Sequence, residues 1–132
     1  MASNIADFLA DELIDHFLRN SAYTPAATVY IGLFTSAIND DFSGTECSGG
    51  DYARESIAFD AAATRATSNT ALITFTEASA SWGEVGWVGL SDADTAGDGL
   101  AWGAVDTAKT IGSGDTAKIA AADLTFTFTA TV

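Results

Sequence analysis

The stretch that decides the fold is WGEVGWVGLSDADTAGDGLAWGAV, residues 82–105. It holds all three tryptophans of the chain and six of its twelve glycines. Two apolar runs, Val85–Leu90 and Leu100–Val105, flank the acidic, glycine-bearing connection Ser91–Gly99, which is the pattern of a β-hairpin with a long loop. The first run is apolar on both alternating faces: Val85, Trp87 and Gly89 on one, and Gly86, Val88 and Leu90 on the other. Because a strand of this kind is covered on both faces, we expect the hairpin at the centre of the fold.

Further strands are predicted on both sides of the hairpin, where β-branched and aromatic runs alternate with turn-forming residues. They are Thr28–Thr35, Tyr52–Phe59, Thr70–Thr76, Thr116–Ile119 and Leu124–Val132. The last run alternates cleanly, which predicts its apolar residues inward: Leu124, Phe126, Phe128 and Ala130. Residues 60–69 are expected to be a connector, and residues 36–51 a long polar loop with a contact role or mobility. About seven strands after one helix predict a mainly β fold, either an antiparallel β-sandwich or a flattened barrel.

Residues 4–19 are predicted to form the single helix, with Asn4 as its N-cap. One apolar stripe recurs at i, i+4 spacing, and further apolar residues lie off this stripe. Two interpretations therefore stay open: the helix packs on the sheet, or its spare apolar side meets a neighbouring subunit. For such an interface we predict the loop 36–51 and four helix residues, namely Ile5, Phe8, Leu9 and Phe17.

Length and charge limit the classes of function. The 132 residues suit one domain, 1–132, with the helix at 4–19 and the β-sandwich at 28–132. Five basic against eighteen acidic residues give a formal net charge of −13, which disfavours nucleic acid as a partner. No apolar run approaches the roughly 20 residues that span a bilayer, and the acidic start is unlike a secretory signal, so no membrane is expected.

Candidate chemistry is sparse. The single histidine, His16, has no evident catalytic partner and is expected to be a surface or interface residue of the helix. Asp92, Asp94 and Asp98 form the one clustered set of oxygen ligands, but they depart from the EF-hand pattern and fit a turn equally well. They are therefore weak candidates for Ca²⁺. Cys47 is alone, which excludes an internal disulfide and leaves a loop thiol or an intermolecular bridge. We expect no enzyme activity, no resident metal and no cofactor.

Several blocks of the chain resemble a family of small virion proteins from tailed bacteriophages. After the amphipathic helix these blocks are NSAYTPAATVYIGLFT (20–35), SGGDYARESIAF (48–59), TSNTALITF (67–75), WGEVGWVGLSDA (82–93) and TIGSGDTAKIAAADLTF (110–126). Their order and spacing extend over nearly the whole chain. Members of this family are often labelled as tail-fibre proteins.

The resemblance implies a structural component of the virion, assembled in the host cytoplasm, and carries no catalytic residues over to this chain. A capsid decoration (cement) protein is favoured, because the chain is short, acidic and shows no internal repeat. Its implied partners are the major capsid protein or another virion protein, and further copies of itself. The alternatives are a tail or neck fibre or collar component, and a module that binds glycans or the host surface through the tryptophans or the acidic loop.

Overall fold

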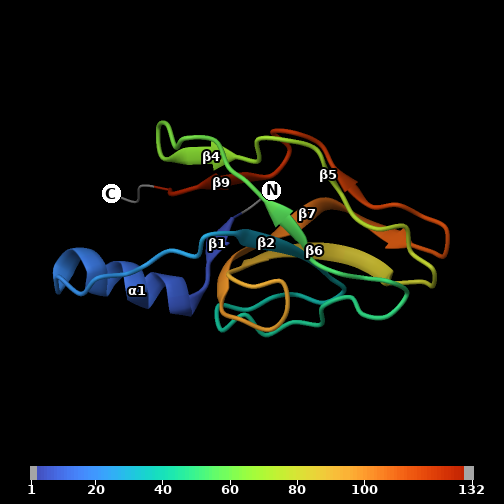
Figure 1. Ribbon diagram of the computed structural model, residues 1–132, viewed down its shortest axis with the longest axis horizontal. Helices are drawn as coiled ribbons and strands as arrows, with labels where there is room; N and C mark the ends of the chain where they lie inside the picture. The colour runs from blue at the N-terminus through green and yellow to red at the C-terminus, as the bar shows by residue number, and fades with distance from the viewer. Residues whose placement is uncertain (1–2, 130–132) are drawn as a thin grey trace.

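The structure is a computed structural model that describes residues 3–129, and antiparallel strands make up most of its regular elements (Figure 1). Within these residues there is one helix, near the N-terminus, so the predicted mainly β class is confirmed. In chain order the elements are β1 (Asn4–Ile5), α1 (Asp7–Leu18), β2 (Val29–Phe34), β3 (Glu55–Ile57), β4 (Ala66–Ser68), β5 (Ile73–Thr74), β6 (Gly83–Ser91), β7 (Gly99–Ile111), β8 (Lys118–Ile119) and β9 (Thr125–Thr127).

Five strands form the main sheet in the order β1-β7-β6-β2-β3, and each neighbouring pair is antiparallel. The two longest strands, β6 and β7, are the arms of the predicted hairpin, and β6 is the central strand. Two short pairs, β4–β9 and β5–β8, lie over one face of this sheet (Figure 1). The sheet ends at β1 and β3 over the described residues and does not close, so the predicted barrel alternative is wrong and a layered arrangement is found.

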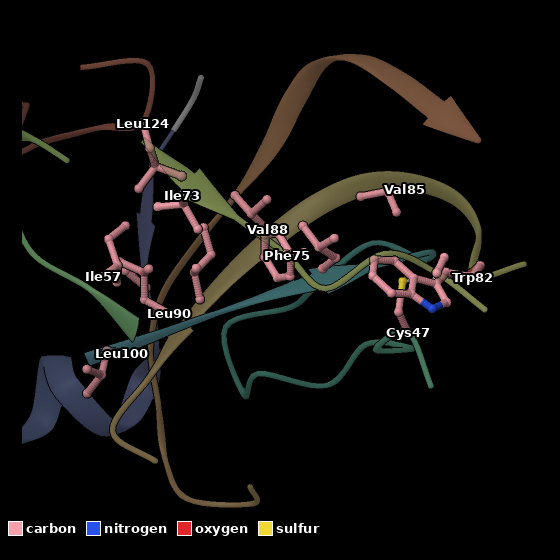
Figure 2. Packing of buried hydrophobic residues seen from close by; sticks show 14 residues of the cluster. Cys47, Ile57, Ile73, Phe75, Trp82, Val85, Val88, Leu90, Leu100 and Leu124 are labelled. Atoms are coloured by element: carbon pink, nitrogen blue, oxygen red, sulfur yellow. Dashed lines mark hydrogen bonds between the residues drawn. The ribbon is translucent and has the colours of Figure 1, made fainter. Parts of the chain in front are cut away.

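The core lies between the main sheet and the short pairs (Figure 2). Branched side chains of β2 and β6 face it in register, because Ile31 pairs with Leu90 and Leu33 with Val88. Residues outside the main sheet complete the cluster, including Ile73, Phe75 and Leu124. The ring of Trp82 is 5 % exposed and packs edge-to-face with Tyr52 and Phe75, at centroid distances of 5.2 and 6.5 Å, a favourable aromatic arrangement.

The pairing of β6 with β7 is irregular near Gly86. Val85 pairs with Lys109 but Trp87 with Ala104, so Gly86 alone lies opposite residues 105–108 and the extra residues are in β7. Because such an irregularity disrupts the ladder and twists the strands, strict alternation is lost across it. Val85 and Val88 were expected on opposite faces, but both are buried and line one groove. That part of the prediction is wrong, whereas the burial of β6 between two covering layers is confirmed.

The second face of the main sheet is covered by residues 36–51. The ring of Phe42 lies over β6 and β7, where a Cβ at Gly89 would come within 2.6 Å of it and one at Gly99 closer still. Phe42 also packs edge-to-face on Phe34 of β2, with ring centroids 5.7 Å apart. Glycine therefore occurs in these strands because its missing side chain leaves room for an aromatic ring. The long polar loop predicted from the sequence is a packed layer of the fold.

The helix begins later than predicted. Asn4 pairs with Trp102 as part of β1, so it is not the N-cap, and α1 starts after Ala6, which makes no side-chain capping bond. Backbone partners replace the missing cap: the Ala6 N–H donates to the Leu100 carbonyl at 2.9 Å and the Asp7 N–H to the Asp40 carbonyl at 2.8 Å. These bonds satisfy two donors that a helix start leaves open.

Other predicted boundaries also move. The expected connector 60–69 contains β4, which pairs with β9. β7 extends past Val105 to Ile111, because its second half pairs with Gly83–Val85. At the last strand Leu124 is buried and Phe126 half-buried, but Phe128 is 52 % exposed, so its predicted inward position is wrong. Ala130 and the rest of the predicted strand lie outside the described residues.

One buried polar side chain holds the short pairs together. Asn69 is 1 % exposed, and its Nδ2 donates to the carbonyls of Ala71 and Ala120 at 2.9 and 2.8 Å. Its Oδ1 accepts from the Leu124 N–H at 2.9 Å. Because a buried amide is costly unless its hydrogen bonds are made, this residue fixes residues 69–71 against 120–124.

Candidate interaction surfaces

The far end of α1 presents apolar side chains to solvent. The helix projects from one end of the β layers (Figure 1), and within it no residue is fully buried. Ile14, Phe17 and Leu18 are 47, 66 and 73 % exposed. Their i, i+3, i+4 spacing places them on one face, and we call this group the helix tip. Asp11 and Asp15 lie on neighbouring turns, so the apolar tip has an acidic border.

The structure separates the four residues predicted for an interface. Ile5 belongs to β1 and pairs with Ala101 of β7. Phe8 and Leu9 are half-buried and pack against the core cluster. Phe17 alone stands free of the β layers, at the helix tip. The first interpretation is therefore correct for the first turn of the helix, which packs on the sheet, and the last turn is exposed. The interface itself remains a prediction.

His16 is a surface residue at the chain reversal after α1. Its Nδ1 accepts the Tyr23 N–H at 3.3 Å and lies 3.2 Å from the Ser21 carbonyl oxygen. Asn20 lies between His16 and Ser21 in the chain and has a positive φ of 55°. Asparagine tolerates this conformation better than most residues do. These contacts return the chain from the helix toward β2.

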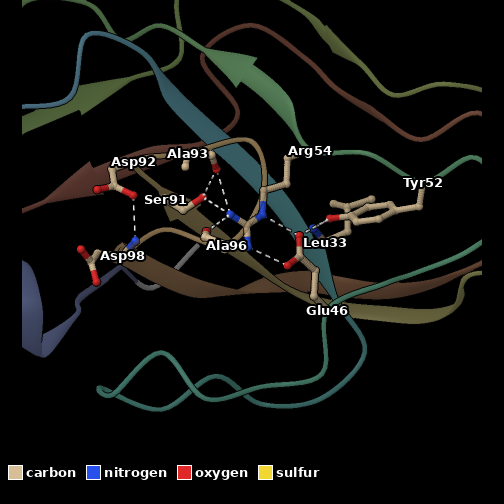
Figure 3. A network of polar contacts seen from close by, with 9 residues as sticks. All are labelled: Leu33, Glu46, Tyr52, Arg54, Ser91, Asp92, Ala93, Ala96 and Asp98. Carbon is tan, nitrogen blue, oxygen red and sulfur yellow. Dashed lines mark hydrogen bonds and ion pairs between the residues drawn. The ribbon is translucent and has the colours of Figure 1, made fainter.

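Arg54 is the centre of a polar network that the sequence reasoning did not identify (Figure 3). Its guanidinium binds both carboxylate oxygens of Glu46 at 2.8 Å, and this bond to Glu46 is the main reason why its pKa is raised. On the other side it donates to Ser91 Oγ and to the carbonyls of Ala93 and Ala96, each at 2.8 Å. The side chain is only 11 % exposed. Arg54 therefore ties the 36–51 layer to the hairpin loop with bidentate geometry.

Tyr52 completes this network. Its hydroxyl donates to Glu46 Oε1 at 2.9 Å and accepts the Leu33 N–H at 2.8 Å, and burial raises the pKa of this phenol. A Cβ at Gly32 would come within 2.6 Å of that same carboxylate oxygen, so glycine is needed here too. Arg54 lies in the SGGDYARESIAF block, but only the fold shows what it binds.

The hairpin loop is closed by its own aspartates. The Asp92 carboxylate accepts the Asp98 N–H at 2.7 Å, and the Asp92 N–H donates to the Asp98 carbonyl at 3.1 Å. Ala96 and Gly97 both have positive φ, as a tight turn requires. In residues 3–129 no group of three or more His, Cys, Asp or Glu side chains is arranged to hold a metal ion. The structure thus gives Asp92 a role in the turn and does not gather Asp92, Asp94 and Asp98 into a ligand set.

An apolar groove of about 380 Å³ opens between the second half of β7 and the β8 region. Its floor contains core residues, among them Leu33, Phe75 and Val88. Both lysines of the chain, Lys109 and Lys118, border it. A second hollow of about 320 Å³ shares both lysines and continues toward Leu124. The sequence did not predict this groove. The one available signal was that both lysines of this acidic chain lie close to the turn 112–115, nine residues apart.

The tryptophans do not form an exposed stacking platform. Trp82 is buried, and its Nε1 donates to the Gly50 carbonyl at 3.0 Å. Trp87 and Trp102 are both half-buried in the central hairpin. Cys47 is buried as well, with Sγ 3.7 Å from the Trp82 carbonyl oxygen, so an intermolecular bridge would require its surroundings to open.

Residues 4–127 match the protein family described as Podophage GP4 fiber I protein gp80. The chain belongs to this fiber I family. The match extends from β1 to β9 and so includes the main sheet, the helix and the lysine-bordered groove. No curated protein matches the chain. The resemblance to small tailed-phage virion proteins, predicted from the sequence blocks, is confirmed.

Membership of the fiber I family makes this chain a structural protein of the phage particle. A structural fibre family also speaks against an enzyme. Within residues 3–129 no helix combines the length and apolar character needed to cross a membrane.

Proposed function

We propose that the chain is a fibre subunit of a podophage particle that binds its neighbours in the virion through the helix tip. The observation that carries the fibre role is the family match, which covers 4–127 and names a fibre protein. The fibre alternative is therefore preferred over the decoration role expected from the short, acidic chain.

The distribution of apolar surface supports a docking role for α1. The central hairpin, the 36–51 layer and the short pairs cover one another and leave Leu72 and Phe128 exposed at separate places in the chain, whereas three large apolar side chains are exposed together at the helix tip. Exposed apolar residues that gather at one place mark interaction sites more often than singly scattered ones do. The first turn of α1 is fixed to the body by Phe8 and Leu9, so the tip is held at a defined position.

Capsid decoration is the second candidate. It is supported by the same protruding helix, which would suit docking on a shell, and by the net charge of −13, which favours a soluble outer surface. The partners would then be the major capsid protein and further copies of this chain. The two roles predict different places and copy numbers in the particle.

Cryo-electron microscopy of intact particles, with quantitative mass spectrometry of purified particles, tests the proposal. A fibre subunit gives density at the tail or neck and far fewer copies than the major capsid protein. Density repeated over the head, with a copy number comparable to that of the capsid protein, would establish decoration instead. Absence of the chain from purified particles would overturn both roles.

A further inference from the structure

We infer that the helix tip of one copy docks into the lysine-bordered groove of a second copy, so that subunits join head to tail. The inference deepens the proposed fibre role and takes its biological meaning from it. Its test in solution does not depend on that role, because self-association is measured on the isolated protein.

The chemistry of the two surfaces is complementary. The helix tip offers Ile14, Phe17 and Leu18 beside Asp11, and beside Asp15, which forms an exposed ion pair with Arg19. The groove offers an apolar floor with Lys109 and Lys118 at its border. An apolar face with acids on its flank thus matches an apolar cleft with bases on its rim, which is how an amphipathic helix binds a groove.

The positions of the basic residues support this pairing. The chain has only five basic side chains against eighteen acidic ones, so two copies repel each other at most approaches. Over residues 3–129, Arg54 and Arg19 form ion pairs with Glu46 and Asp15, and none is formed by Arg65 or by the two lysines. Of these three unpaired bases, the two lysines lie together at the border of an apolar groove. A second copy carries the matching acid, Asp11, beside its exposed apolar group.

The geometry excludes docking of a helix tip into the groove of its own chain. Along the longest axis α1 lies at one end of the molecule, and the turn after β7 that borders the groove lies at the other (Figure 1). A contact between two different surfaces is heterologous, and it generates a ring if the rotation closes or a filament if it does not. Either product is a repeating assembly of the kind a fibre or collar needs. The groove volume of about 380 Å³ suits a few large side chains, so each single contact should be weak and dependent on concentration.

The experiment is a complementation between two variants measured by sedimentation velocity on the full chain. Variant one carries Phe17→Asp and Leu18→Asp, and variant two carries Lys109→Glu and Lys118→Glu. All four positions are exposed, so both variants should keep the circular dichroism and melting temperature of the parent protein. Leu72→Asp is the matched control, because Leu72 is 56 % exposed but lies outside both surfaces.

Head-to-tail docking predicts that the parent protein and the Leu72→Asp control assemble as concentration rises. Each double variant alone should be monomeric, with its dissociation constant raised at least tenfold. Their equimolar mixture should form a 1:1 dimer, since one copy keeps an intact groove and the other an intact tip. A monomeric parent, a double variant that assembles normally, or a mixture that stays monomeric would each overturn the inference. Normal assembly of the lysine variant, with the tip variant monomeric, would indicate a symmetric helix–helix contact, and binding of the tip to another virion protein alone would leave the parent monomeric.

Discussion

Two apolar stretches of similar length differ in burial: β6 is covered within the chain, whereas the end of α1 is exposed. β6, nine residues, is buried on both faces between the short pairs and the 36–51 layer. α1, twelve residues, has no fully buried residue and ends in three exposed apolar side chains. The sequence of each predicts apolar contact, but only β6 finds that contact within its own chain. An apolar pattern thus indicates that a surface should be covered without saying which molecule covers it.

The same substitution should have very different effects on stability in the buried core and at the helix tip. Phe75 is 1 % exposed and Phe17 is 66 % exposed. Phe75→Ala should lower the free energy of unfolding by about 3–5 kcal/mol because it leaves a cavity in the core. Phe17→Ala should change it by no more than about 0.5 kcal/mol. Urea denaturation measures both, and equal losses would show that the helix tip belongs to the folded core.

Loss of an ion pair should lower stability more in the buried network around Arg54 than on the exposed helix. Arg54→Ala leaves Glu46 without its bidentate partner and removes bonds to two carbonyls, so we expect a loss of about 2–4 kcal/mol. Arg19→Ala removes an exposed i, i+4 pair with Asp15 and should cost at most about 0.5 kcal/mol. Thermal unfolding at two salt concentrations separates the effects, because salt screens the exposed pair more strongly. The prediction fails if both variants unfold at the same temperature.

Two glycines of β6 should respond differently to substitution by alanine, because only one of them lies under the 36–51 layer. At Gly89 a methyl group would enter the ring of Phe42, so Gly89→Ala should cost about 1–3 kcal/mol. At Gly86 the nearest atom to such a methyl is Ala108 Cβ at 3.9 Å, so Gly86→Ala should be tolerated to within about 1 kcal/mol. Chemical denaturation of both variants tests this, and a tolerated Gly89→Ala would mean that the 36–51 layer does not press on the sheet.

The smallest expected effect concerns the titration of Cys47. Burial raises the pKa of this thiol from 9.0 to about 11. Unfolded chains lose the thiol proton near pH 9, whereas the folded protein keeps it, so the contribution is intact below pH 9 and is lost as pH rises toward 11. Stability should therefore fall more steeply with pH for the parent protein than for Cys47→Ala, measured by urea midpoints at pH 8, 9.5 and 11. Parallel pH profiles would contradict a buried thiol.

The sequence predicted the parts of the fold that depend on local pattern. The hairpin of β6 and β7, the single helix and the antiparallel class follow from apolar runs and turn residues. What it could not predict depends on contacts between distant segments. Asn69 was predicted to lie in a polar connector. It is buried, and its side chain forms hydrogen bonds with the backbone of Ala120 and Leu124, far along the chain. The sequence also offered no reason for the glycines within β2, β6 and β7. In the structure Gly89 and Gly99 leave room for the ring of Phe42, and Gly32 leaves room for the Glu46 carboxylate.

The same distinction applies to the candidate surfaces. Helical periodicity identified Phe17 but grouped it with Ile5, Phe8 and Leu9, which the fold holds against its own sheet. The groove is formed only when β7 and the β8 region come together, so its lysines carry no recognisable motif. Family membership supports the virion role that the sequence blocks predicted, and the place of the chain in the particle remains a proposal.

We propose that the helix tip is a docking element and not part of the folded core. Removing residues 1–20 would test it poorly, because that deletion also removes β1 and the packed side chains of Phe8 and Leu9. The direct measurement is the copy number of this chain in purified particles carrying Phe17→Asp and Leu18→Asp, with Leu72→Asp particles as the control. We predict that the double variant folds with an unchanged melting temperature but is absent from particles, while the control is incorporated normally. Incorporation of the double variant at the parent copy number would contradict the account.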